Sequence, residues 1–184
     1  MAGALVLVVG PSGAGKDTLM EGARAALADD PRIVFPGRLV TRDATAHEAH
    51  GTISPAEFDA GERAGAFALS WRAHGLGYAV ERGVLDLVAQ GRVCVVNGSR
   101  SRVAEARARL PGVRVVEITA PRDVLAARIA ARGRDADPQA RLARSDALAP
   151  IAADATIVND CSVAEGVAAL VSALREMAGK NPSP

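Results

Sequence analysis

The stretch GPSGAGKDT, from Gly10 to Thr18, holds the residues best suited to chemistry in this sequence of 184 residues. Its glycines and lysine match the phosphate-binding P-loop, and the apolar run before it and the helical pattern after it are the context that this motif requires. Glycines allow positive φ, so backbone N–H groups can face an anion, and the N-terminus of the next helix adds partial positive charge. We expect ATP to bind here, with Lys16 reaching its β- and γ-phosphates.

The predicted nucleotide contacts in this loop are Gly10, Pro11, Ser12, Gly13, Ala14, Gly15, Lys16, Asp17 and Thr18. The alternative is a glycine turn followed by a surface lysine.

Asp17 departs from the usual motif, in which a serine or threonine at this position binds magnesium. Thr18 could supply the hydroxyl and Asp17 could hold a metal-bound water, because Mg²⁺ prefers oxygen ligands and keeps several waters. Alternatively, Asp17 only favours the helix N-terminus. No predicted strand ends in a clear Walker B aspartate, and the nearest candidates are Asn97 and Asp160. A motor or switch ATPase, which couples hydrolysis through that acidic residue, is therefore disfavoured.

The elements that must position these residues alternate along the chain. Valine-rich runs, typical of parallel strands buried on both faces, cover residues 4–9, 93–99, 113–119 and 155–160. Helical patterns cover residues 17–27, 84–89, 103–110, 124–131 and 163–177. This alternation predicts βαβ units in a three-layer α/β domain, the P-loop NTPase fold with a parallel central sheet.

Residues 35–80 interrupt this rhythm. Ser54, Pro55 and Glu57 form a capping-box pattern for a short helix, and the strand-like pieces RLVT and AFALSW flank it. We expect an inserted α+β lobe here.

Composition limits the partners and the compartment. The formal net charge is +1, so no bulk field favours nucleic acid, and the longest apolar run is far shorter than the roughly 20 residues of a membrane span. Cys94 and Cys161 lack CxxC spacing and are expected to be buried thiols in a reducing compartment. We expect a cytoplasmic enzyme with a small-molecule substrate, no nucleic acid or membrane partner, and a monomeric or homodimeric state.

Six segments together resemble the guanylate-kinase-like nucleoside monophosphate kinases, and within that group most closely the ribose 1,5-bisphosphate phosphokinases. They are GPSGAGKDT, RLVTRD (38–43), LSWRAHGLGY (69–78), VNGSR (96–100), RGRD with ARLAR (132–144) and VND (158–160). The P-loop is generic, whereas VTRDA, LSW with HGL, and VNGSR are more specific to this branch. The likeness runs from about residue 4 to residue 175.

The resemblance implies one P-loop kinase domain with two mobile lobes. Its core would comprise residues 1–34, 91–121 and 149–180, with an acceptor-binding lobe at 35–90 and a helical lid at 122–148. The implied reaction is phosphorylation of ribose 1,5-bisphosphate by ATP, with Mg²⁺, to 5-phosphoribosyl 1-diphosphate, as part of phosphonate breakdown.

The resemblance also implies roles for individual residues. In the lid, Arg132 and Arg141 match lid and post-lid arginines that touch phosphates in this kinase group, and Arg134 and Arg144 are further candidates, whereas Arg122 and Arg128 are expected to be solvated. On the acceptor side the candidates are Arg38, Arg42, Ser70, Tyr78, Asn97 and Arg100, with Trp71 expected to pack in the core. Asn159 and Asp160 resemble an adenine-side loop, or form a turn with a helix cap.

Two other functions remain open from the sequence. The first is a guanylate kinase or another small-molecule kinase, although Ser70 stands where guanylate kinases place the glutamate that reads guanine. The second is a binding module that has lost catalysis, although such modules usually lack the loop lysine or the lid arginines.

Overall fold

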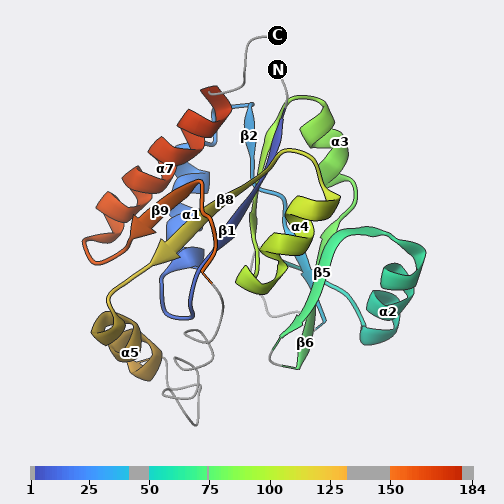
Figure 1. Ribbon diagram of the computed structural model, residues 1–184, viewed down its shortest axis with the longest axis horizontal. Helices are drawn as coiled ribbons and strands as arrows, with labels where there is room; N and C mark the ends of the chain where they lie inside the picture. The colour runs from blue at the N-terminus through green and yellow to red at the C-terminus, as the bar shows by residue number, and fades with distance from the viewer. Residues whose placement is uncertain (1–2, 42–49, 74, 132–149, 180–184) are drawn as a thin grey trace.

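The computed structural model describes residues 3–41, 50–73, 75–131 and 150–179, which form two sheets with helices packed around the larger one (Figure 1). Within these residues, the larger sheet has five strands joined by parallel pairings in the order β2-β7-β1-β8-β9. These strands are β2 (Ile33–Val34), β7 (Val93–Asn97), β1 (Ala4–Val9), β8 (Val113–Thr119) and β9 (Ala155–Val158). The predicted α/β class with a parallel central sheet is confirmed.

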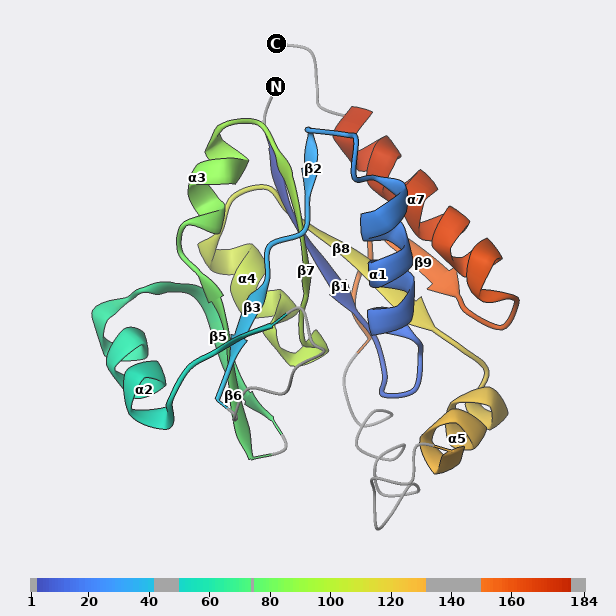
Figure 2. The same ribbon diagram turned by 180° about the vertical axis from the view of Figure 1, so that it is seen from behind.

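Helices cover both faces of this sheet, as Figures 1 and 2 show together. On one face α1 (Lys16–Ala26) lies beside α7 (Val163–Gly179), and α5 (Arg122–Ala131) packs at the end of the same layer. The other face carries α3 (Val84–Ala89) and α4 (Val103–Arg109), which follows a short 3-10 turn at Arg100–Arg102. The result is the three-layer arrangement that the alternating pattern predicted.

Strand β1 lies at the centre of this sheet, between β7 and β8, and all six of its residues are buried. Val6 and Val8 point into the core beneath α1 and α7, whereas Leu5, Leu7 and Val9 point toward α3 and α4. A strand that must be apolar on both faces reads as a continuous hydrophobic run. This rigid strand ends directly at the P-loop.

The second sheet is built between β2 and α3 in the order β4-β3-β6-β5. Its strands are β4 (His50–Thr52), β3 (Arg38–Val40), β6 (Leu76–Glu81) and β5 (Phe67–Ala73), and α2 (Pro55–Ala64) packs against it. The capping box predicted for α2 is present, since the Ser54 hydroxyl accepts from the Glu57 N–H and the Glu57 carboxylate accepts from the Ser54 N–H. β6 was not predicted, because Gly77 breaks its strand pattern. A Cβ at Gly77 would lie 2.9 Å from the Phe58 ring of α2.

The two cysteines differ. Cys94 is buried in β7, and this burial raises the pKa of its thiol to about 11. Cys161 is exposed, so the expectation of two buried thiols was wrong for Cys161, which lies in the turn between β9 and α7. Among the described residues, no helix has the length and apolar character needed to cross a membrane.

Candidate active site

The loop between β1 and α1 has the backbone that only glycine adopts easily. Gly13 and Gly15 have φ of 84° and 89°, and Gly10 has φ of 148°. A Cβ at Gly10 would lie 1.9 Å from the Ile118 carbonyl oxygen of β8, so this position also needs glycine for space. The first helical residue is Lys16 and the N-cap is Gly15, which has no side chain to cap the first turn. The N–H groups of this turn therefore meet whatever binds in front of the loop.

Lys16 folds back along the loop. Its ammonium donates to the carbonyl oxygens of Gly10 and Pro11, each at 2.9 Å. The single positive charge of the loop therefore lies against its own backbone, at the end of β1. An ammonium with three rotatable donors can keep such contacts while it faces a phosphate, which a planar guanidinium cannot do in the same space.

Asn159 supports the loop from inside the protein. It follows β9, is 5% exposed, and its amide donates to the Ala14 carbonyl at 2.8 Å. The Asn159 N–H in turn donates to the Thr119 carbonyl at the end of β8 at 2.7 Å. The structure gives the Asn159 side chain a supporting contact with the loop, and its predicted contact with the nucleotide stays a prediction. Asp160, its predicted companion, is exposed.

Arg128 connects α5 to Asn159. It is half-buried, and its guanidinium donates to the Asn159 carbonyl at 3.0 Å. The expectation that Arg128 is simply solvated was therefore wrong, whereas Arg122 is exposed as expected. Gly13 lies against the same helix, since a Cβ there would be 3.1 Å from the Leu125 carbonyl oxygen and from Ile129. The first helix of the predicted lid thus contacts the P-loop directly.

Asp17 and Asn97 meet across the site. The Asn97 amide nitrogen donates to an Asp17 carboxylate oxygen at 2.6 Å, so the carboxyl end of β7 is joined to the first turn of α1. Asp17 and Thr18 are both exposed. Three or more His, Cys, Asp or Glu side chains do not gather into a metal-binding group anywhere in the described part of the chain. A magnesium site here would fit one carboxylate, a hydroxyl, waters and the phosphates of the nucleotide.

Arg38 and Tyr78 are brought together on one face of the second sheet. The Arg38 guanidinium lies over the Tyr78 ring, 5.0 Å from its centroid, and the Tyr78 ring stacks on Trp71 with centroids 5.5 Å apart. Trp71 is 5% exposed, in agreement with its predicted packing role. Thr41 fixes the end of this segment, because its hydroxyl accepts from the Gly77 N–H at 2.7 Å.

Ser70 lies on the opposite face of that sheet. It pairs with Ala79, one position from the Trp71–Tyr78 pair, and neighbouring residues of a strand point to opposite faces. The Ser70 hydroxyl donates to Glu62 of α2 at 2.7 Å, and Arg72 contacts the same carboxylate at 2.8 Å. The Ser70 side chain is therefore turned toward α2 and away from Arg38 and Tyr78, and its role as a substrate contact stays a prediction.

Arg100 forms an ion pair that the sequence reasoning missed. Its guanidinium lies 3.5 Å from the Glu117 carboxylate, and both side chains are largely buried, at 15% and 19% exposure. Glu117 belongs to β8, beside Val9 of β1, and is therefore close to the start of the loop. The signal was an acidic residue that follows the valine pair Val115 and Val116 near the carboxyl end of a strand, where ligands of open α/β sheets bind.

Five predicted arginines lie outside the described residues. They are Arg42 of the acceptor lobe and Arg132, Arg134, Arg141 and Arg144 of the lid. Their roles stay predictions.

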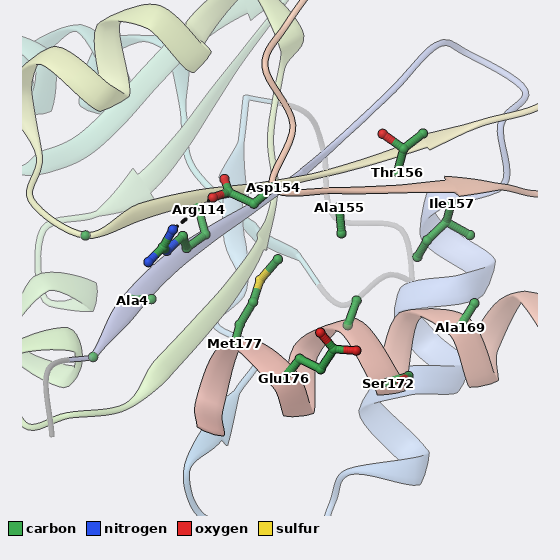
Figure 3. Close-up of a pocket in the computed structure, with 13 residues that line it drawn as sticks. Ala4, Arg114, Asp154, Ala155, Thr156, Ile157, Ala169, Ser172, Glu176 and Met177 are labelled. Carbon is green, nitrogen blue, oxygen red and sulfur yellow. Dashed lines mark hydrogen bonds and ion pairs between the residues drawn. The ribbon is translucent and has the colours of Figure 1, made fainter. Parts of the chain in front are cut away.

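A cavity of about 560 Å³ opens at the other end of the sheet, away from the P-loop (Figure 3). It lies between α7 and the beginnings of β1, β8 and β9, and none of its described lining residues was predicted as a site residue. Asp154 at its edge accepts from the Val115 N–H at 2.8 Å and from Arg114 at 3.0 Å. Burial raises the pKa of Asp154, but these donors outweigh it and hold the pKa below its usual value. Asp154 thus ties the approach to β9 onto β8.

The fold and the loop define a class. A P-loop between a buried parallel strand and a helix, with a second small sheet beside it, is the arrangement of a guanylate-kinase-like P-loop kinase. Guanylate kinase from Anaplasma phagocytophilum superposes with a TM-score of 0.70 over 97% of this chain and 88% of that chain, at 20% identity. A gluconokinase from Sinorhizobium meliloti gives 0.53 over 97% and 94%, at 20% identity. At these identities the likeness shows the fold.

Sequence comparison defines the family. The ribose 1,5-bisphosphate phosphokinase PhnN of Methylobacterium radiotolerans is 58% identical over 177 residues, which cover 95% of this chain and 99% of that protein. The enzyme of the same name from Rhodopseudomonas palustris is 53% identical over 85% of this chain and 80% of its own length. No protein-family model matches the sequence. The chain belongs to the ribose 1,5-bisphosphate phosphokinase family, and it is a phosphotransferase as predicted.

Some relatives carry the kinase within a larger protein. In Cupriavidus necator a bifunctional ribose 1,5-bisphosphokinase-thymidine phosphorylase is 46% identical over 94% of this chain, which spans 29% of that protein.

The contact of Asn159 with the loop leads to a first prediction. In Asn159→Ala the buried Ala14 carbonyl loses its donor, which lowers the free energy of unfolding by about 1–3 kcal/mol. The loop also loses its preorganised shape, so we expect ATP to bind about tenfold more weakly, equivalent to about 1.4 kcal/mol. Urea unfolding and titration calorimetry with ATP measure the two effects.

Two variants control this experiment. Asn159→Asp places a carboxylate against the Ala14 carbonyl, two acceptors without a proton between them, and should be at least as harmful as Asn159→Ala. Cys161→Ser changes an exposed neighbour and should leave unfolding unchanged. Normal ATP affinity in both Asn159 variants would contradict the anchoring role.

Proposed function

We propose that the protein transfers the γ-phosphoryl group of ATP to the 1-phosphate of ribose 1,5-bisphosphate, which yields ADP and 5-phosphoribosyl 1-diphosphate. The observation that carries this proposal is the P-loop with Lys16 folded onto it, in a chain 58% identical to a ribose 1,5-bisphosphate phosphokinase along 99% of that protein. The loop supports ATP as the donor. The names of the relatives support the acceptor.

The transfer needs alignment more than acid–base chemistry. An oxygen of the acceptor phosphate forms a bond to the γ-phosphorus while the bond from that phosphorus to the ADP oxygen breaks. A phosphate monoester has a second pKa of about 6, so the acceptor is mostly dianionic at neutral pH and no general base has to remove a proton. The protein must hold two anions together and neutralise the charge on the passing group.

Lys16 and the loop amides perform this task on the donor side. The Lys16 ammonium, already 2.9 Å from two loop carbonyls, can turn to the β- and γ-phosphates without leaving the loop. Arg132 and Arg141 are proposed to contact the transferred phosphoryl group from the lid. Asp160 remains a proposed contact of the adenine side.

Arg38 and Tyr78 are proposed to bind the acceptor with Arg42, because their stacked pair presents a guanidinium and a phenol on one face. Arg100, held by Glu117 near the loop, is proposed to bind a phosphate or ribose hydroxyl between the two substrates. Arg134 and Arg144 are further proposed contacts. A bidentate guanidinium suits a terminal phosphate.

Asp17 and Thr18 would hold Mg²⁺, since they supply exposed oxygen donors next to the loop. The ion, when bound, neutralises charge on the nucleotide phosphates. We also propose a cytoplasmic, monomeric or homodimeric enzyme of phosphonate breakdown, with no nucleic-acid or membrane partner.

GMP is a poor acceptor in this proposal. Ser70 stands where guanylate kinases place the glutamate that reads guanine, and the carboxylate to which Ser70 donates, that of Glu62, is also paired with Arg72. A base edge would have to break both contacts to bind it. When one partner of a required hydrogen bond is missing, kcat/KM for that substrate falls by a factor on the order of 10⁴.

A comparison of acceptors tests the reaction. Phosphorus NMR of the protein with Mg-ATP and ribose 1,5-bisphosphate should show ADP and a new sugar-linked diphosphate, whereas GMP, AMP and gluconate should give almost no ADP. Rapid ADP formation with GMP and none with ribose 1,5-bisphosphate would contradict the assignment.

Lys16 variants test the donor side. Lys16→Ala should lower kcat by about 10²–10³, because the charge that follows the phosphoryl group is lost. Lys16→Arg should recover little, since a planar fork does not replace a compact ammonium. Arg175→Ala, which removes an exposed cation of α7, is the control and should keep full activity. Near-normal turnover of folded Lys16→Ala, checked by circular dichroism, would refute the role.

A further inference from the structure

The P-loop motif does not explain why the side chains in contact at positions 17 and 97 are a carboxylate and an amide. In the usual P-loop enzyme, the residue after the lysine is a neutral serine or threonine, and an aspartate at a strand end supplies the carboxylate of the magnesium site. Here the residue after Lys16 is the carboxylate, and the strand-end residue is a neutral amide. The two side chains are hydrogen-bonded at 2.6 Å although 80 residues separate them.

We propose that these two positions have exchanged their chemistry, so that Asp17 supplies the single protein carboxylate of the magnesium site and Asn97 is the residue that positions it. The inference rests on the proposed use of Mg-ATP and adds a specific division of labour to it. Thr18 then acts at most as a supporting hydroxyl.

The sheet explains why the exchange is possible. β7 runs parallel to β1, with Asn97 in register with Val8, and the Gly98 N–H donates to the Val8 carbonyl at 2.9 Å. Asn97 lies on the same face of β7 as Val95, which is the face covered by α1. The end of β7 is therefore fixed beside the first turn of α1, and either position can reach the same point in front of the loop.

The hydrogen bond has only one possible polarity. A carboxylate has oxygens that only accept, so the Asn97 amide must turn its nitrogen to Asp17, and its own oxygen is directed elsewhere. One Asp17 oxygen is fixed by this bond, which orients the remaining oxygen. Outer partners that orient a metal-binding carboxylate in this way typically contribute 10–100-fold to metal affinity.

The exchange also conserves charge. Two carboxylates in contact at these positions would repel each other, and two neutral side chains would leave the ion without a carboxylate from this pair. The pair must therefore carry one carboxylate in total, at either position. This requirement can be tested by moving the carboxylate back.

The experiment measures how much Mg²⁺ strengthens ATP binding, without any acceptor present. Calorimetry gives the ATP affinity in Mg²⁺ and in EDTA, and their ratio is the magnesium gain. Asp17→Ser should lower this gain by about 10–100-fold, and Asn97→Ala should lower it by about tenfold. The double variant D17S/N97D, which restores the usual arrangement, should regain about tenfold over Asp17→Ser alone.

One control variant and the wild type separate the possible outcomes. Glu21→Gln removes an exposed charge of the same helix, one turn beyond Asp17, and should keep the full gain. An unchanged gain in Asp17→Ser would overturn the proposal and leave Asp17 as a helix N-terminal charge. A loss that the double variant does not recover would also overturn it, because the positions would not be interchangeable. Failure of the wild type to bind ATP would instead overturn the proposed function itself.

Discussion

The shape of the P-loop depends on the donors that hydrogen-bond to its carbonyl oxygens. A loop that grips a polyphosphate with its N–H groups must turn its carbonyls the other way, and those carbonyls need donors inside the protein. Lys16 donates to the Gly10 and Pro11 carbonyls, Asn159 donates to the Ala14 carbonyl, and the Leu19 N–H donates to the Gly15 carbonyl. With its carbonyls held in this way, the loop stays open toward the side where a phosphate approaches.

The parallel sheet brings the donors and their helpers to the loop. β1 leads into the loop itself, β7 ends at Asn97, and β9 ends just before Asn159, and the carboxyl ends of parallel strands lie at one edge of the sheet. α5 then adds Arg128 to Asn159 and packs against Gly13. A movement of α5 would therefore change two contacts that reach the loop, one through Asn159 and one at Gly13. One edge of the sheet therefore connects the loop with the proposed magnesium site and the predicted lid.

Much of this arrangement could be predicted from the sequence, because the signals are local. Continuous valine runs identify buried parallel strands, and the glycine and lysine spacing fixes the loop and the start of α1.

Contacts between distant segments were not predictable in the same way. Asn159 reads equally well as a turn residue, and its burial under Ala14 depends on how β9 and α1 pack. Ser70 was predicted from the resemblance to a family, but the face of the sheet on which it lies depends on strand pairing with Ala79. The Asp17–Asn97 bond depends on the register of β7 beside β1, which neither segment encodes alone.

The central claim is that ATP binds to the backbone amides of the loop, and hydrogen exchange tests it most directly. Exchange of residues 12–18 should slow markedly when Mg-ATP is added, whereas exchange in α3 and β5 should change little. Equal exchange in the loop with and without the nucleotide, or protection only at the cavity between α7 and β9, would contradict the account.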